Sequence, residues 1–127
     1  MLYIYCRQRC TSSPKAIQWL TKYRIEFIVK SSGLISREEL ITVLTSTDNG
    51  FDDLLRHPSK VKEEDLSKLL LFQKMPLNQA IDYIKVNPNL LKSPIMIEKN
   101  KVLIGYDPEQ IRMFLPQKYR RKLLFRS

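Results

Sequence analysis

Cys10 is the residue of this sequence best placed to do chemistry. It follows a short apolar stretch at residues 2–5 and stands in a polar loop, after which a helical pattern begins near Ala16. The same stretch carries three cations, Arg7, Arg9 and Lys15. Free N–H groups at a helix start, together with nearby cations, stabilise a thiolate, so we expect the pKa of Cys10 to lie below its ordinary value of about 8.5.

A thiolate at the start of a helix can react with oxidants or disulfides, or can hold an oxyanion. The alternative is an inert buried cysteine, which the polar and basic loop argues against. Cys6 is the second cysteine, and a Cys6–Cys10 disulfide would require Cα atoms within about 7 Å, a condition that the sequence leaves open. Two thiols without other clustered ligands do not make a zinc site, so we expect no metal and no cofactor.

The length of 127 residues predicts one domain over residues 1–116, followed by a basic tail at residues 117–127. No apolar run approaches the 18 or more residues that a membrane span needs, and the first residues lack the long apolar region of a signal peptide. We therefore expect a cytoplasmic protein without membrane contact, whose cysteines start in the reduced state.

The net charge of +9 is concentrated at the two ends of the chain. Residues 1–24 and residues 117–127 each contain five basic residues and no acidic one. Basic ends indicate contact with nucleic acid or with an acidic protein surface, although a merely soluble cationic protein is the alternative. Because no DNA-reading motif is evident, we expect weak, non-specific DNA contact rather than sequence reading.

The remaining chain must position Cys10, and its hydrophobic pattern predicts both helices and strands. Helices are predicted at about residues 14–24, 37–44, 51–55, 60–74, 77–86 and 108–115, and strands at about residues 2–5, 26–29, 95–97 and 102–104. Side chains are expected to cap three of the helices: Ser36 with Glu39 as a capping box, Asp107 at the last helix, and one of Thr11, Ser12 or Ser13 at the first. His57, the only histidine, is expected in a solvent-facing loop.

The first strand, helix and second strand should form a parallel pair, and the last two strands an antiparallel hairpin. This order predicts an α/β protein with a thioredoxin-like fold, a four-stranded mixed sheet and inserted helical segments. In that fold a proline before the third strand lies against the reactive cysteine, often after a cis peptide bond. We therefore predict a cis Ser93–Pro94 bond beside Cys10.

Several short motifs, in order along nearly the whole chain, match one protein family. They are Tyr5-x4-Cys10-Thr11-Ser12, Lys15-Ala16, Trp19-Leu20, Thr47-Asp48-Asn49-Gly50, Ser59-Lys60-Val61, Met75-Pro76-Leu77, Asn87-Pro88-x-Leu90-Leu91-x-x-Pro94-Ile95 and Ile104-Gly105-Tyr106-Asp107-x-x-x-Ile111-Arg112-x-Phe114-Leu115-Pro116. The chain resembles the Spx branch of the arsenate-reductase-like (ArsC) family, which consists of bacterial transcription regulators that act on RNA polymerase.

The resemblance implies a monomer whose surface near Gly50 binds the C-terminal domain of the polymerase α subunit and thereby alters promoter use, as in a stress response. Spx proteins typically carry a Cys-x-x-Cys redox switch. Here Cys10 matches the first cysteine, but Ser13 replaces the second, so the usual disulfide cannot form. Redox sensing would then depend on Cys6, on a mixed disulfide with a small thiol, or on a sulfenic acid at Cys10.

The resemblance also bears on enzymatic activity. The Spx branch commonly has an arginine immediately before the proline matched by Pro94, where it helps to hold an anion. This chain has Ser93 there, preceded by Lys92, and these two residues are the candidates for contact with an anion.

Arsenate reductases surround the thiolate with arginines that bind the oxyanion. We expect Arg56 and Arg112 to face elsewhere, and Arg7 and Arg9 to be ordinary loop residues. The prediction is therefore a regulator that is not an enzyme. The alternative is a thiol-dependent arsenate reductase or a glutaredoxin-like oxidoreductase that uses Cys10.

Overall fold

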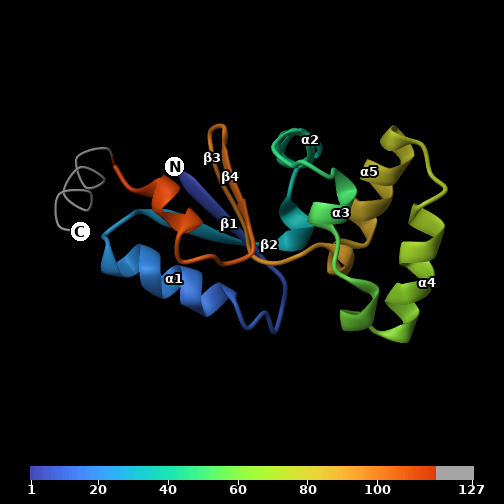
Figure 1. Ribbon diagram of the computed structural model, residues 1–127, viewed down its shortest axis with the longest axis horizontal. Helices are drawn as coiled ribbons and strands as arrows, with labels where there is room; N and C mark the ends of the chain where they lie inside the picture. Colours follow the sequence, from blue (N-terminus) through green and yellow to red (C-terminus); the bar gives the residue numbers. More distant parts are fainter. Residues whose placement is uncertain (117–127) are drawn as a thin grey trace.

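The computed structural model describes residues 1–116, which build a mixed sheet with helices packed around it (Figure 1). The basic tail at residues 117–127, with the apolar residues 123–125, lies outside the described residues.

The described residues form four strands and five α-helices. The strands are β1 (Leu2–Cys6), β2 (Phe27–Ser31), β3 (Ile95–Glu98) and β4 (Lys101–Ile104). The α-helices are α1 (Ser13–Lys22), α2 (Arg37–Thr45), α3 (Phe51–Leu54), α4 (Glu63–Phe72) and α5 (Leu77–Val86). Short 3₁₀ turns are η1 (Ser32–Leu34), η2 (Pro58–Lys60), η3 (Pro88–Leu90) and η4 (Gln110–Phe114). None of the helices within residues 1–116 is long and apolar enough to cross a membrane.

The four strands lie in the order β2-β1-β3-β4, which confirms the predicted mixed sheet. β1 runs parallel to β2 after the crossover through α1, whereas β3 is antiparallel to both β1 and β4. Ile4 stands opposite Val29 on one side and Met96 on the other, so β1 is a central strand. The carboxyl end of β1 therefore delivers the following loop, with Cys10, to the middle of one sheet edge.

The sheet separates two hydrophobic clusters, because successive side chains of a strand point to opposite faces. Leu2 and Ile4 pack with Leu20 of α1 on one face. Tyr5 packs on the other face with residues of α2 to α5, and Figure 1 shows these helices gathered apart from α1. The inserted helices thus share one cluster and pack against the sheet face opposite α1.

A carboxylate joins α2 to the central strand. Ser36 and Glu39 form the predicted capping box, in which each side chain accepts a hydrogen bond of 3.0 Å from the other residue's backbone N–H. The second oxygen of Glu39 accepts a hydrogen bond of 2.5 Å from the hydroxyl of Tyr5, which is 1% exposed. One side chain therefore satisfies both a helix terminus and a buried phenol.

We expect Glu39→Ala to lower the free energy of unfolding by about 1–3 kcal/mol, because it removes a cap and leaves the Tyr5 hydroxyl without that partner. Urea denaturation measures the change. Glu38→Ala, at the neighbouring position of the same first turn, is the control. Equal losses in the two variants would contradict the dual role of Glu39.

Three local predictions differ from the structure. The last helix is the 3₁₀ turn η4, whose cap residue is Glu109, and Asp107 accepts from the N–H groups of Glu109 and Gln110 in the turn before it. The helix predicted from residue 60 begins at Glu63, since the Lys60 carbonyl accepts a hydrogen bond from the Arg56 side chain instead. The cap of α1 is Ser12, which makes no side-chain capping bond.

Candidate functional site

Cys10 lies half-buried in the loop between β1 and α1, against the residues that precede β3. Arg9 adopts a positive φ of 60°, and this turn directs the following residue back toward the sheet edge. The Cys10 thiol donates a hydrogen bond of 3.3 Å to the Ser93 carbonyl. The Arg7 N–H donates one of 2.8 Å to the Ser93 hydroxyl, and the Ser93–Pro94 bond is cis as predicted. Residues more than eighty positions apart thus meet at the thiol.

The pKa of Cys10 lies below its ordinary value, as predicted. Burial raises this pKa, but hydrogen bonds from Ser13 and Ser93 and from the backbone of Ser13 and Ser12 together lower it more. Burial raises the pKa of Cys6, and the charge of Cys10 adds to that rise. The two thiols are therefore unequal: Cys10 ionises first.

Ser13 is the site residue whose role the sequence did not reveal. It opens α1, and its side chain is 5% exposed. The hydroxyl is buried, and hydrogen bonding by Ser13 lowers the pKa of Cys6 as well as that of Cys10. We interpret it as a donor for whichever sulfur becomes an anion.

We expect Cys10 to be alkylated by iodoacetamide with a pH midpoint below about 8.5, because the folded loop stabilises its thiolate. The Cys6→Ser variant isolates this reaction. The reactive fraction increases as pH rises, so a lowered pKa moves the whole curve toward acid. The same variant unfolded in urea supplies the reference, and a folded midpoint at or above the unfolded one would contradict the expectation.

The side chains of Arg7 and Arg56 both bind backbone carbonyls. Burial and the charge of Arg7 lower the pKa of Arg56, whereas the charges of Asp65 and Cys10 raise it. Arg7 donates to the Leu91 carbonyl (3.2 Å), and Arg56 donates to the carbonyls of Lys60 (2.5 Å) and Asn89 (3.4 Å). The sequence could not reveal this arrangement, because all the acceptors are backbone carbonyls, which any residue type supplies.

The other predicted site residues lie in different surroundings. Arg112 forms an ion pair of 3.6 Å with Glu109 on η4, and Arg9 is exposed.

Lys92 lies near Asp53. Hydrogen bonds from Asn49 are the main cause that lowers the pKa of Asp53, and Asp48 and the Lys92 charge lower it further. Of the two candidates for anion contact, Ser93 therefore meets the thiol, and Lys92 acts on the turn before α3. His57 is exposed, as predicted, and its ring accepts a hydrogen bond from the Ser59 N–H.

Gly50 occupies that turn, with φ 62° and ψ −129°, a backbone conformation that residues other than glycine rarely adopt. A Cβ at this position would meet nothing within 4 Å, so the turn opens to the surroundings. Asn49 donates to the Asp53 carboxylate from its backbone (3.1 Å) and from its side chain (3.3 Å). Asp48 and Asn49 of the turn are thus exposed, Gly50 is half-buried, and the turn is held in one shape.

A short pairing joins the Gly50 turn to the thiol loop. Leu55, just after α3, forms an isolated antiparallel bridge with Leu91. The Arg56 N–H donates to the Leu90 carbonyl (2.8 Å), and the Lys92 N–H donates to the Leu54 carbonyl (2.9 Å). The segment that ends in Ser93 is therefore hydrogen-bonded directly to the segment that follows Gly50.

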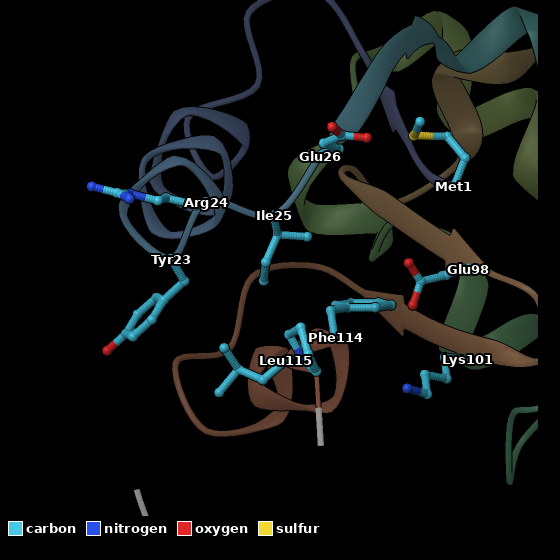
Figure 2. A pocket seen from close by; sticks show the side chains of 10 residues that line it. Met1, Tyr23, Arg24, Ile25, Glu26, Glu98, Lys101, Phe114 and Leu115 are labelled. Carbon is cyan, nitrogen blue, oxygen red and sulfur yellow. The ribbon is translucent and has the colours of Figure 1, made fainter. Parts of the chain in front are cut away.

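A separate cleft of about 600 Å³ lies near the start of β1, at the other end of that strand from Cys10. Figure 2 shows Phe114 pointing toward Glu98 and Lys101 there, with Ile25 and Leu115 on the same wall. Its lining residues include no cysteine and none of the predicted site residues. The cleft is therefore distinct from the site around Cys10.

Comparison with known proteins gives a consistent relationship. Residues 5–114 match the ArsC family. The chain is 33% identical over 129 residues to the global transcriptional regulator Spx of Streptococcus pyogenes serotype M1, with 98% of this chain and 92% of that protein covered. It is 32% identical over 127 residues to Spx of Streptococcus mutans serotype c, with 98% and 90% covered.

Solved structures show the same fold. An ArsC family related protein from Bacteroides fragilis superposes with a TM-score of 0.71 at 20% identity, over 89% of this chain and 96% of that one. An arsenate reductase from Vibrio cholerae gives a TM-score of 0.70 at 21% identity, over 90% and 97%. Together with the Spx similarity over nearly the full length, these matches show that the chain belongs to the ArsC family.

Proposed function

We propose that this protein is a transcription regulator that binds the C-terminal domain of the RNA polymerase α subunit through the surface around Gly50 and thereby alters promoter use. The observation that carries the proposal is the similarity to streptococcal Spx regulators over 98% of the chain. The Gly50 turn falls within that similarity.

The geometry of the turn supports a docking role. Phe51, directly after Gly50, packs edge-on against Phe72 of α4, with ring centroids 4.7 Å apart and an interplanar angle of 84°. This contact anchors α3 while Gly50 stays open to a partner. Three carboxylates, those of Asp48, Asp52 and Asp53, surround the turn and would favour a basic partner surface.

Contact with DNA in the proposed complex would be weak and non-specific. The cations Arg9, Lys15 and Lys22 are exposed in and around α1, where they can meet phosphates without reading bases. The protein is proposed to act as a monomer, with DNA contact that weakens as salt concentration rises.

Calorimetry with the purified full chain and the isolated C-terminal domain of the α subunit tests the proposal. We expect a saturable complex of one copy of each. Absence of binding, with both proteins folded by circular dichroism, would overturn it. In vitro transcription with and without the chain then shows whether promoter use changes.

A second candidate function is thiol-dependent arsenate reduction, which the lowered pKa of the Cys10 thiol favours. The serine before Pro94 counts against it, because that position lacks the cation that would hold an oxyanion. Arsenite formation from arsenate, with glutathione and glutaredoxin as reductants, separates the two functions. Turnover that Cys10→Ser abolishes would favour the enzyme.

A further inference from the structure

A second cavity, of about 440 Å³, opens among α3, α4 and α5, in the group of helices that lies apart from α1 (Figure 1). Its volume falls in the range of about 300–1,000 Å³ that is typical of small-molecule sites. The apolar part of its lining consists of six side chains, those of Phe51, Leu55, Leu69, Phe72, Met75 and Ala80. The lining includes no cysteine and shares no residue with the cleft near the start of β1, so this cavity is a separate site.

The apolar wall combines buried side chains with partly open ones. Phe72 and Ala80 are 6% and 1% exposed and belong to the cluster shared by α2 to α5. Phe51 and Met75 are half-buried and pack against that cluster, so part of each side chain stays open to the cavity. The two phenylalanine rings meet edge-on, with centroids 4.7 Å apart. A ligand ring that joins them gains aromatic contact in addition to burial, so the cavity favours an aromatic ligand.

Charged side chains also line the cavity. Arg56 and Lys92 contribute two positive charges and Asp52 one negative charge, so the fixed charge of the lining is net positive. Within residues 1–116 neither of these cations forms an ion pair with a carboxylate. Asp65 and Asp53 act on Arg56 and Lys92, respectively, from beyond ion-pair distance. Cations without an ion-pair partner bind a carboxylate through charge-assisted hydrogen bonds, so the charge of the lining favours an anionic ligand.

The backbone holds the two cations on paired segments. The isolated bridge joins Leu55 to Leu91, and backbone hydrogen bonds flank it on both sides. Arg56 and Lys92 are the residues that directly follow the two members of this bridge. The Arg56 side chain also donates to the Lys60 carbonyl (2.5 Å), which restricts its position. A restricted side chain loses less conformational entropy when it binds an anion, so the pairing prepares the cavity for one.

We propose that this cavity binds a small aromatic monocarboxylate, with the ring of the ligand against Phe51 and Phe72 and its carboxylate at Arg56 and Lys92. The site goes beyond the proposed transcription function and does not depend on polymerase binding.

Methionine methyl groups report on the cavity in the full chain. The chain contains four methionines, of which Met75 lines this cavity and Met1 lines the cleft near the start of β1. The protein is labelled with ¹³C-methyl methionine and titrated with 4-phenylbutyrate, and Met75→Leu assigns the Met75 signal. We expect a saturable shift of that signal with a dissociation constant of about 1 mM or tighter, while the Met1 signal stays in place. Absence of a saturable Met75 shift, or an equal shift of Met1, would overturn the proposal.

Two further probes test the class of ligand. 4-Phenylbutyramide has the same ring and chain without the charge, and we expect it to bind about tenfold more weakly or worse. Inorganic phosphate has charge without a ring and should leave the Met75 signal in place. Equal affinity for the amide and the carboxylate would remove the role of the cations. Phosphate binding as tight as that of 4-phenylbutyrate would show an anion site that needs no apolar body, and either result rejects the proposal.

Substitution of the cations tests the carboxylate contact. Lys92→Gln and Arg56→Gln are each expected to weaken binding of 4-phenylbutyrate by about tenfold, because each removes a charged donor. Lys85→Gln is the matched control, since Lys85 is exposed on α5 and does not line the cavity. Affinities of Lys92→Gln and Arg56→Gln that both equal that of Lys85→Gln would contradict the assignment of the anion-binding end.

A larger side chain at Ala80 tests the place of binding. Ala80→Leu adds volume inside the cavity, so we expect the saturable Met75 shift to be lost. Gln79→Leu, at the exposed neighbouring position of α5, adds a leucine outside the cavity and should bind as the wild type does. Circular dichroism shows whether each variant is folded, and the titration of Lys92→Gln decides the proposal if Ala80→Leu does not fold. Equal affinity of folded Ala80→Leu and Gln79→Leu would place the ligand elsewhere and refute the site.

Discussion

Gly50→Arg is expected to lower the affinity for the C-terminal domain of the α subunit by at least about thirtyfold, the effect of losing a central interface contact. Two causes act together. An arginine side chain would project from the open turn into the space that the proposed partner occupies. A residue with a Cβ is also strained at φ 62°, so the turn itself would shift. Calorimetric titration of wild type and variant gives the ratio of the two dissociation constants.

Two control variants separate bulk from strain. Gly50→Ala imposes the same backbone strain but adds only a methyl group, so we expect a smaller loss of affinity. Gly33→Arg places the same side chain on an exposed glycine without a positive φ, and this variant should bind as the wild type does. Equal affinity of Gly50→Arg and wild type would exclude the Gly50 surface. Equal losses in Gly50→Ala and Gly50→Arg would assign the effect to the shape of the turn.

Phe72→Ala should lower the free energy of unfolding by about 3–5 kcal/mol, because it leaves a cavity in the cluster shared by α2 to α5. Phe72 is 6% exposed and supports Phe51 by the edge-on ring contact. Urea denaturation, with the m-value compared between wild type and variant, measures the loss.

The neighbouring residue provides a matched control for that substitution. Leu71 lies on the same helix, is also large and apolar, and is 58% exposed. We expect Leu71→Ala to change the free energy of unfolding by less than about 1 kcal/mol, since little surface of this side chain is removed from water in the folded state. A Phe72→Ala loss no larger than that of Leu71→Ala would show that α4 contributes little to the cluster.

The sequence predicts the sheet well because the signals for it are local. Period-two and apolar runs identify the four strands, and the Ser36–Glu39 box identifies the start of α2. The cis bond before Pro94 is predictable only once the fold has been recognised. Features that depend on neighbouring residues in the chain are therefore accessible from the sequence alone.

The site is predicted less completely, because its geometry depends on contacts between distant segments. The Arg56 side chain donates hydrogen bonds to the carbonyls of Lys60 and Asn89, and no residue type in the sequence indicates the bond to the distant Asn89. The sequence identifies Ser13 as the residue in place of a second cysteine. That its side chain is buried, and that it lowers the pKa of both thiols, follows only from the packing of the folded chain.

The bridge between Leu55 and Leu91 connects the segment after α3 to the segment that leads to Ser93. Ser93, which holds the thiol, lies two residues after one member of that pair, and the Gly50 turn lies a few residues before the other. The path of covalent bonds and hydrogen bonds from Ser93 to the Gly50 turn is therefore short and contains no flexible linker. Because backbone hydrogen bonds flank this pair on both sides, we expect a displacement of the Ser93 backbone to shift α3 and the Gly50 turn with it.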